Sequence, residues 1–353
     1  MLSKAQSKGE IYTLAQSGTP FSLNTSQSVE VSGNGTDYFD NPSLINRARR
    51  KTISRAVILM LIDIAKEKGD KQRVQHYWNA YHCQSKIYRS ENKLYGKYCK
   101  NRFCTVCCAI RKADIINRYF PIIKKWQDPH FITLTVKSIS ARNLNKWIKG
   151  MNKAFKLILN RCKKRYQRGT GIQLIGIKSL ECNFNPQRKT YNPHFHIIVS
   201  SKQIADLLKK EWMLQWNRTS TLHASHKAQF IRKVDSLERD LIETIKYGSK
   251  IFTEPDIKNK KENSFAPIIY AKALDNIFVA MKSQRIFERF GFNLPQQKQK
   301  EPSTKLLFDF KTYVFNSNAT DWIDENTGEC LTGYAQPTEL QYLLNDCVNT
   351  KLD

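Results

Sequence analysis

The stretch Pro-His-Phe-His-Ile-Ile-Val, residues 193–199 (PHFHIIV), predicts a β-strand on which polar and apolar side chains alternate. In an extended strand alternate side chains share a face, so His194 and His196 project together while the apolar residues between and after them face a core. Two imidazoles side by side can hold one divalent metal ion. The alternative is a surface strand that carries two histidines by chance.

A second predicted strand precedes this one, at residues 173–182 (QLIGIKSLEC). Ile175, Ile177 and Glu181 have the same parity and therefore share a face, which the isoleucines indicate to be partly buried. A carboxylate that continues such a face costs free energy unless it has a partner. Glu181 is therefore the candidate third metal ligand, and a solvated glutamate at a strand end is the alternative.

A third polar pattern, ETIKYGSK, covers residues 243–250. Glu243 and Tyr247 stand four residues apart, so they lie on one face of a predicted helix, and Lys246 and Lys250 form a second such pair. A tyrosine hydroxyl can attack a phosphorus atom, and a carboxylate can activate a water molecule. Taken alone, a tyrosine beside lysines on a helix is more often a packing residue.

Around these motifs the sequence predicts an α+β protein whose largely antiparallel sheet is backed by helices. The stretch FITLTV (131–136) is a strand with Ile132, Leu134 and Val136 on one face, and residues 229–234 are a further strand. Two prolines in residues 183–193 favour a long hairpin loop there. We expect a boundary or kink at Pro121. Helices are predicted over 44–67, 113–126, 142–168, 203–217 and 237–251.

These motifs together resemble the HUH endonuclease superfamily, and more closely the rolling-circle replication initiators of small Gram-positive plasmids. The segments that carry the resemblance are FITLTV, KSLECNFNPQRKTYNPHFHIIVS and ETIKYGSK, and the resemblance covers about residues 83–295. It implies a five-stranded antiparallel sheet with helices behind it. It also implies that His194, His196 and Glu181 bind Mg²⁺ or Mn²⁺.

In the family that the chain resembles, the motif tyrosine attacks a DNA phosphodiester. The attack leaves a 5′-phosphotyrosyl link and a free 3′-OH that primes synthesis. Carried over, the nucleophile is Tyr247, and Glu243 is the residue implicated in ending the cycle by water attack. A transposase or a mobilisation relaxase would share this chemistry, so both stay open as alternatives.

Four cysteines form a second candidate metal site. Cys99, Cys104 and Cys107 have the spacing C-x4-C-x2-C, and Cys83 lies sixteen residues before Cys99. Four thiolates can close a tetrahedral structural Zn²⁺ site, and the resembled family tends to carry similar segments. His82 could replace Cys83 as a ligand, and buried free thiols are the alternative. A non-enzymatic, zinc-containing DNA-binding protein would also explain this cluster.

The charge of the 353-residue chain is strongly positive, because 58 Lys+Arg exceed 31 Asp+Glu by 58 − 31 = 27. Such an excess points to a polyanion. The resemblance implies that this polyanion is DNA, single-stranded at a nick site. Residues 142–168 hold ten Lys/Arg and no acidic residue. The candidate DNA-contacting residues are Lys153, Lys156, Arg102, Lys246 and Lys250.

The sequence also indicates where the protein is located, whether it uses ATP and how its domains are organised. No stretch approaches the roughly 20 apolar residues of a membrane span, and the first residues lack a secretory pattern, so we expect a cytoplasmic protein. No phosphate-binding G-x-x-x-x-G-K-[ST] motif occurs. We therefore expect no ATP use and a dependence on a host helicase and polymerase. The expected organisation is a flexible segment (1–42), a helical, Cys-rich zinc-binding region (43–127), an HUH endonuclease domain (128–295) and a C-terminal extension (296–353).

Overall fold

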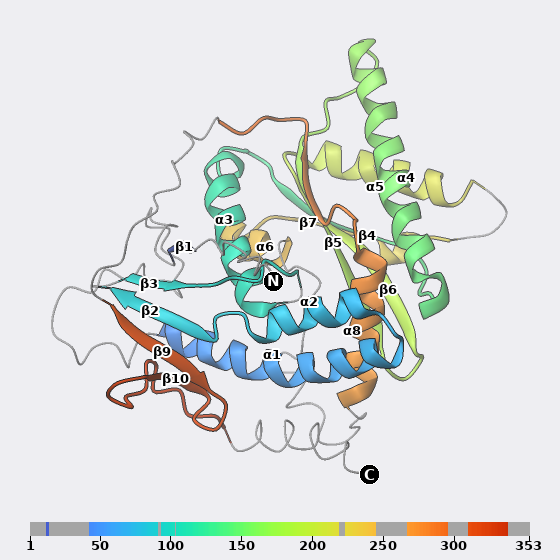
Figure 1. The fold of residues 1–353 in the computed structure, drawn as a ribbon. Coiled ribbons are helices and arrows are strands. Elements are labelled where there is room, and N and C mark those ends of the chain that lie inside the picture. The colour runs from blue at the N-terminus through green and yellow to red at the C-terminus, as the bar shows by residue number, and fades with distance from the viewer. Residues whose placement is uncertain are drawn as a thin grey trace, which may run out of the picture. The chain divides into compact units, whose positions relative to one another are not determined.

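A computed structural model describes residues 12–13, 42–90, 93–102, 104–218, 223–244, 267–295 and 310–337. The chain divides into two compact units (Figure 1). The first comprises residues 1–110 and 298–353, and the second comprises residues 111–297. None of the helices in the described part of the chain is long and apolar enough to cross a membrane.

The first unit combines two helices with an antiparallel sheet. Its helices are α1 (Pro42–Glu67) and α2 (Lys71–Tyr81), and Asp70 caps α2 by accepting a hydrogen bond from the backbone N–H of Arg73 at 2.9 Å. Its sheet has the order β1-β3-β2-β9-β10. The strands are β1 (Tyr12–Thr13), β2 (Lys86–Ser90), β3 (Lys93–Gly96), β9 (Lys311–Asn316) and β10 (Asp321–Asp324).

The position of β9 and β10 differs from the expected organisation. Part of the expected C-terminal extension is ordered and pairs with β2, so it belongs to the first unit rather than standing apart. Trp322 on β10 is fully buried, and its indole N–H donates to the carbonyl oxygen of Gln84 at 2.7 Å. The hydrophobic burial of such large side chains holds these C-terminal strands in the sheet.

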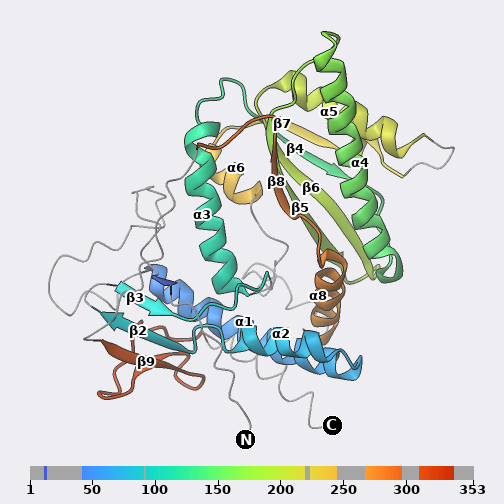
Figure 2. The ribbon, with the colours of Figure 1, turned by 45° about the horizontal axis from the view of Figure 1, so that its top comes forward.

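The second unit contains the predicted five-stranded antiparallel sheet, in the order β7-β4-β6-β5-β8 (Figure 2). The fold class expected from the sequence is therefore confirmed. The strands are β4 (His130–Thr135), β5 (Gly176–Asn185), β6 (Thr190–Val199), β7 (Phe230–Lys233) and β8 (Phe287–Phe290).

Three helices cover one face of this sheet: α4 (Ala141–Gln167), α5 (Lys202–Trp216) and α8 (Pro267–Met281). Apolar residues of α4 and α5 interlock there with Phe195 and Ile197 of β6, which the alternation of PHFHIIV predicted to face the core. The other face carries α6 (Leu237–Thr244), which contacts β6. It also carries the end of α3 (Thr105–Ile123), whose Tyr119 ring meets Phe287 edge-on at 5.1 Å.

Two local expectations were wrong. The hairpin between β5 and β6 is tight rather than long, because pairing continues to Asn185 opposite Thr190. Cross-strand contact between the rings of Phe184 and Tyr191, at 5.0 Å, supports the ladder through the proline-containing segment. Helix α3 begins at Thr105 instead of residue 113, and it ends two residues after Pro121.

Candidate functional site

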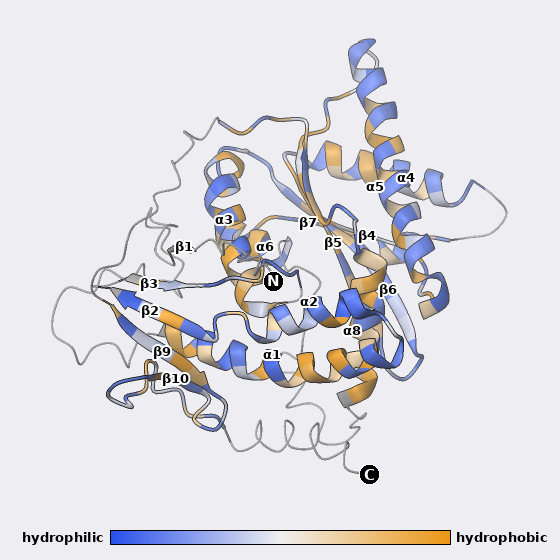
Figure 3. Cartoon of the chain, viewed as in Figure 1, coloured by the Kyte–Doolittle hydropathy of each residue, from blue (hydrophilic) through white to orange (hydrophobic). Residues whose placement is uncertain are grey.

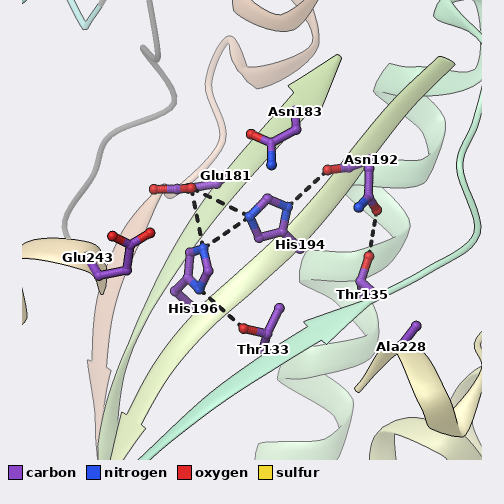
Figure 4. A pocket seen from close by; sticks show the side chains of 9 residues that line it. All are labelled: Thr133, Thr135, Glu181, Asn183, Asn192, His194, His196, Ala228 and Glu243. Carbon is purple, nitrogen blue, oxygen red and sulfur yellow. Dashed lines mark hydrogen bonds and ion pairs between the residues drawn. The ribbon is translucent and has the colours of Figure 1, made fainter. Parts of the chain in front are cut away.

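The strand register brings the three predicted metal ligands together. Glu181 of β5 lies directly opposite His194 of β6, and Ser179 lies opposite His196. The two Nε2 atoms are 3.1 Å apart, and Oε2 of Glu181 lies 3.5 Å from Nε2 of His194 and 3.4 Å from Nε2 of His196 (Figure 4). Three ligand atoms therefore converge on one point from two adjacent strands.

The second nitrogen of each imidazole has its own partner. Nδ1 of His194 lies 3.0 Å from the backbone carbonyl oxygen of Asn192, and Nδ1 of His196 lies 3.4 Å from Oγ1 of Thr133. A carbonyl oxygen only accepts hydrogen bonds, so Nδ1 of His194 is the protonated nitrogen. In the neutral imidazole this leaves a lone pair on Nε2, the nitrogen at the point where the three ligand atoms converge, as a metal-ligating histidine requires.

Glu181 is buried in this group, with 4% of its surface exposed. Burial by itself would raise the pKa of Glu181, but the interaction of its carboxylate with the adjacent imidazoles of His194 and His196 outweighs burial, so the pKa of the carboxyl is lowered. Its second oxygen, Oε1, is buried and has no hydrogen-bond partner among the described residues. Buried carboxylate oxygens are normally satisfied, and a cation would satisfy this one, so the donor set fits a divalent metal.

A pocket of about 320 Å³ opens beside these ligands. Glu243 of α6 lines it, as do the polar side chains of Thr133, Asn183 and Asn192 (Figure 4). Of the predicted catalytic pair, Glu243 thus lies at the candidate metal group. Tyr247, with Lys246 and Lys250, lies outside the described residues.

An ion pair with a buried carboxylate connects helix α6 to the sheet. Asp240, which is 1% exposed, accepts two hydrogen bonds from the guanidinium group of Arg232 on β7, one of them at 2.7 Å. The same guanidinium lies 4.8 Å from the ring centre of Phe131, and that ring is 5.2 Å from the imidazole of His196. A forked pair of this kind fixes orientation as well as distance, so it sets the side of α6 that faces the pocket.

Sequence reasoning did not single out the residues that support the ligands. Thr133 contacts the imidazole of His196 only because β4 pairs with β6 in one particular register, whereas Asn192 lies on β6 itself, two residues before His194. The alternation of FITLTV did separate Thr133 and Thr135 from the apolar face of the strand. That alternation could have suggested a polar neighbour for the histidines, but it could not supply the pairing.

The four predicted zinc ligands also converge, in the first unit. Their Sγ atoms all lie within 4.8 Å of one another, and Sγ of Cys107 is 3.6 Å from that of Cys83 and 3.7 Å from that of Cys99. Cys83 follows α2, Cys99 follows β3, and Cys104 and Cys107 lie at the start of α3.

The side chains next to the four cysteines do not belong to the cluster. His82, the alternative ligand, is not part of the convergent group, and the thiol of Cys108 instead donates to the carbonyl oxygen of Arg102 at 2.8 Å. Within the cluster, hydrogen bonds from Cys107 and Cys83 lower the pKa of Cys104, which favours the thiolate that a metal needs.

The predicted DNA-contacting lysines of the long helix are not beside the candidate metal group. Lys153 and Lys156 are exposed on α4, which packs against the opposite face of the sheet. The sheet therefore lies between these two lysines and the candidate metal group, and their contact with DNA stays a prediction. Arg102 is exposed in the first unit, next to the cysteine cluster.

Comparison with known proteins supports the resemblance. Residues 92–313 match the family described as Replication protein, which is more than half of the chain. "Protein rep" of Staphylococcus aureus is 29% identical over 173 residues, covering 45% of this chain and 73% of the relative. "Protein rep" of Streptococcus pneumoniae serotype 2 is 26% identical over 230 residues, covering 58% and 68%.

"Protein rep" of Bacillus amyloliquefaciens is 28% identical over 140 residues, covering 37% of this chain and 40% of the relative. No solved structure shows a significant match. The family match includes Cys99, Cys104, Cys107 and the His194–His196 strand, whereas Cys83 lies before its first residue. Motifs, fold and family match agree, and we conclude that the chain belongs to the replication protein family and is a plasmid replication initiator.

Proposed function

We propose that this initiator nicks and rejoins one strand of its origin DNA in a metal-dependent reaction, with Tyr247 as the nucleophile. The observation that carries the proposal is the convergence of Glu181, His194 and His196 on one point, with Glu243 lining the same pocket. Two imidazoles and one carboxylate leave coordination positions for other ligands. A closed structural site would use all four positions for protein side chains.

The proposed ligands would hold Mg²⁺ or Mn²⁺, which when bound polarises the scissile phosphate and stabilises its developing charge. The protein's own groups are set for this task before DNA arrives. The carbonyl oxygen of Asn192 fixes the tautomer of His194, and Thr133 restrains the ring of His196. Preorganised ligands of this kind lose little free energy to reorganisation when the substrate binds.

In the nicking step, Oη of Tyr247 forms a bond to phosphorus while the bond from phosphorus to the 3′ oxygen breaks. The phenol gives up one proton and the departing 3′ oxygen takes up one, so a 3′-OH results. Because the phosphoryl bond is kept as a tyrosyl ester, rejoining needs no ATP. The 3′-OH then serves as primer for a host polymerase behind a host helicase.

Glu243 has the second proposed role. It stands one helical turn before Tyr247 in the sequence, and in the structure its carboxylate lines the pocket that the ligands form. Acting as a general base, it would take a proton from a water molecule that attacks the phosphotyrosine. That step releases the DNA and ends the cycle.

We also propose that Cys83, Cys99, Cys104 and Cys107 hold a structural Zn²⁺. The four Sγ atoms are close enough to share one ion, and they come from three separate segments between α2 and α3. An ion shared by these segments would tie together a region of short strands and loops.

The nucleophile is tested by trapping the covalent adduct. Single-stranded oligonucleotides that tile the plasmid carrying the gene are incubated with the protein and Mn²⁺, and adducts are resolved by denaturing electrophoresis. The wild-type chain should form an adduct whose DNA-linked peptide contains Tyr247, as identified by mass spectrometry.

Tyr247→Phe should remove the adduct, because phenylalanine lacks the attacking oxygen. The matched control is Tyr166→Phe, at an exposed tyrosine on α4, which should leave adduct formation unchanged. An adduct that survives in Tyr247→Phe would contradict the assigned nucleophile. Absence of any adduct with the wild-type chain would favour a non-enzymatic DNA-binding protein.

A further inference from the structure

Helix α4 carries a continuous line of exposed cations. We call this line the α4 stripe, and its members recur every three or four residues except for one uncharged position, Asn160, which is also exposed. The spacing keeps them on one side of the helix, over a rise of about 32 Å from the first member to the last at 1.5 Å per residue. The stripe comprises Arg142, Lys146, Lys149, Lys153, Lys156 and Lys163.

The stripe points away from the body of the second unit. The buried residues of α4, among them Leu144, Met151 and Phe155, pack toward the sheet. They alternate with the stripe along the sequence so that the two sets lie on opposite sides of the helix axis. Figure 3 shows the same division as hydrophilic and hydrophobic colour along α4.

The charges of the stripe are not neutralised within the described part of the chain. No ion pair there involves a member of the stripe, whereas the neighbouring Arg161 and Arg165 both pair with Glu211 of α5, each at 2.5 Å. Helix α4 itself contains no acidic residue. Like charges three or four residues apart on one side of a helix repel one another, so an external anion would stabilise the arrangement.

A DNA single strand bound at the metal-site pocket cannot also lie directly along the α4 stripe. The stripe and the Glu181–His194–His196 group lie on opposite faces of one sheet, with the sheet and the full diameter of α4, about 10–12 Å, between them. A strand whose phosphate lies at the pocket would have to turn around the sheet edge to reach the stripe. The stripe therefore suits a second stretch of nucleic acid.

The chemistry of the stripe favours duplex DNA. Proteins that bind single strands place aromatic rings between cations so that bases stack on them. No large aromatic side chain of α4 before Tyr166 is prominently exposed, and the ring of Trp147 is stacked on that of Trp216 at 5.4 Å. Cations without stacking surfaces match a partner that shows only its phosphates, which is a duplex.

We propose that the α4 stripe is a second DNA-binding surface, which holds duplex DNA by its phosphates while the single strand is processed on the other face of the sheet. The part of this inference that concerns processing of the single strand rests on the proposed nicking function. It assigns to the long helix a contact that is independent of sequence and strongly dependent on salt.

The test compares duplex and single-stranded binding in the full chain. The variant replaces Lys146, Lys149, Lys153 and Lys156 by glutamine, which has nearly the helix propensity of lysine. The probes are a fluorescent 20-base-pair duplex unrelated to the origin and the single strand of the same length, titrated at several KCl concentrations. Circular dichroism and thermal unfolding verify that the variant folds.

The expected result is a smaller salt dependence of duplex binding. Each lost phosphate contact should reduce the slope of log K against log salt by about 0.9, so four lost contacts reduce it by about 3 to 4. Binding of the single strand and nicking of a short single-stranded substrate should change by less than about twofold. Replacing the same four lysines by arginine keeps the charge and should preserve duplex binding.

Three results would overturn the inference: an unchanged duplex slope, an equal loss of single-strand binding, or an arginine variant as weak as the glutamine variant. The first means that the stripe does not contact duplex DNA. The second means that its partner is a single strand, and the third that charge is not the cause. Failure of the wild-type chain to nick DNA would overturn the proposed function instead, and the duplex slopes would still be measured.

Discussion

Two groups of potential metal ligands, one in each unit, are built in contrasting ways. Glu181, His194 and His196 project from the middle of two long paired strands, and their geometry is set by the register of the sheet. The four cysteines lie after α2, after β3 and at the start of α3. The first group has a scaffold that exists without any ion, while the second consists of segments that an ion would join.

The two groups also differ in their donor atoms and in the number of coordination positions that they leave open. Two nitrogens and one oxygen beside a pocket of about 320 Å³ leave room for a substrate phosphate and water. Four sulfurs complete a tetrahedron and leave no open position. An open site on a rigid sheet can serve chemistry, whereas a closed site that joins separate segments can serve stability.

The largest expected effect is on the closed site. Cys104→Ser should abolish stoichiometric zinc and destabilise the first unit, because metal-binding free energy in such sites is about 10 kcal/mol or more and is coupled to folding. Even a loss of about 3 kcal/mol lowers the unfolding temperature by roughly 10 °C. Zinc content by mass spectrometry and calorimetric unfolding measure the two effects.

The chain supplies a matched control for this experiment. Cys108→Ser changes a buried thiol four residues away that lies outside the cluster and donates to a carbonyl oxygen, a role that serine can keep. It should retain zinc. If Cys104→Ser also removes Mn²⁺ binding at His194 and His196, the two sites are not independent and the comparison fails.

The next effect concerns the open site. His194→Ala removes a metal ligand, so the nicking rate should fall by more than the 10–100-fold that is typical of outer-sphere partners. The unfolding temperature should move by only a few degrees, since the strands remain paired through their backbones. Zinc content should stay at one per chain.

His226→Ala is the corresponding control, because His226 is exposed on the short helix before β7. Its nicking rate should equal that of the wild-type chain. A His194→Ala variant that nicks at the normal rate would show that the histidine pair is structural. The contrast between an open and a closed site would then disappear.

The smallest expected effect is a change in the free energy of unfolding that leaves metal binding unchanged. Glu211 is buried on α5 and pairs with Arg161 and Arg165, on the face of the sheet opposite the Glu181–His194–His196 group. Burial alone would raise the pKa of Glu211, but hydrogen bonds from the two guanidinium groups lower it overall. Because its folded-state pKa is depressed, its stabilising contribution is present above the unfolded pKa, near 4.5, and is lost as pH falls through the folded value.

Glu211→Gln should therefore cost about 1–2 kcal/mol at pH 7, since both arginines are partly solvent-exposed. The difference from the wild-type chain should shrink as the pH falls below 4.5, as measured by urea unfolding at several pH values. Zinc and Mn²⁺ binding at pH 7 should not change. A difference that persists at low pH would show that packing, rather than charge, carries the effect.

Much of the candidate site could be predicted from local patterns. Alternation with a period of two placed His194 and His196 on one face, and the burial implied by Ile177 gave Glu181 a reason to need a partner. Helical spacing put Glu243 and Tyr247 on one side of a predicted helix. The supports of these residues could not be predicted, because Thr133 and Arg232 reach them only through strand pairing between distant segments.

The C-terminal strands β9 and β10 likewise could not be predicted from local sequence patterns. Residues 311–316 and 321–324 are short, and their sequences contain no motif that links them to β2. They are held by burial of Trp322 and by pairing with a strand more than 200 residues earlier. Hydrophobic periodicity within a segment gives no information about which distant segment it will pair with.

By itself, the sequence determined which side chains share a face in the motif-bearing strands and in the long helix, and its charge indicated a polyanionic partner. These properties follow from backbone periodicity and charge, which are local. Only the tertiary structure decided that Glu181 stands opposite His194, that Glu243 joins them, and that the α4 stripe lies behind the sheet. Register and layer order arise from packing between distant segments, where the burial of apolar surface selects one arrangement among many.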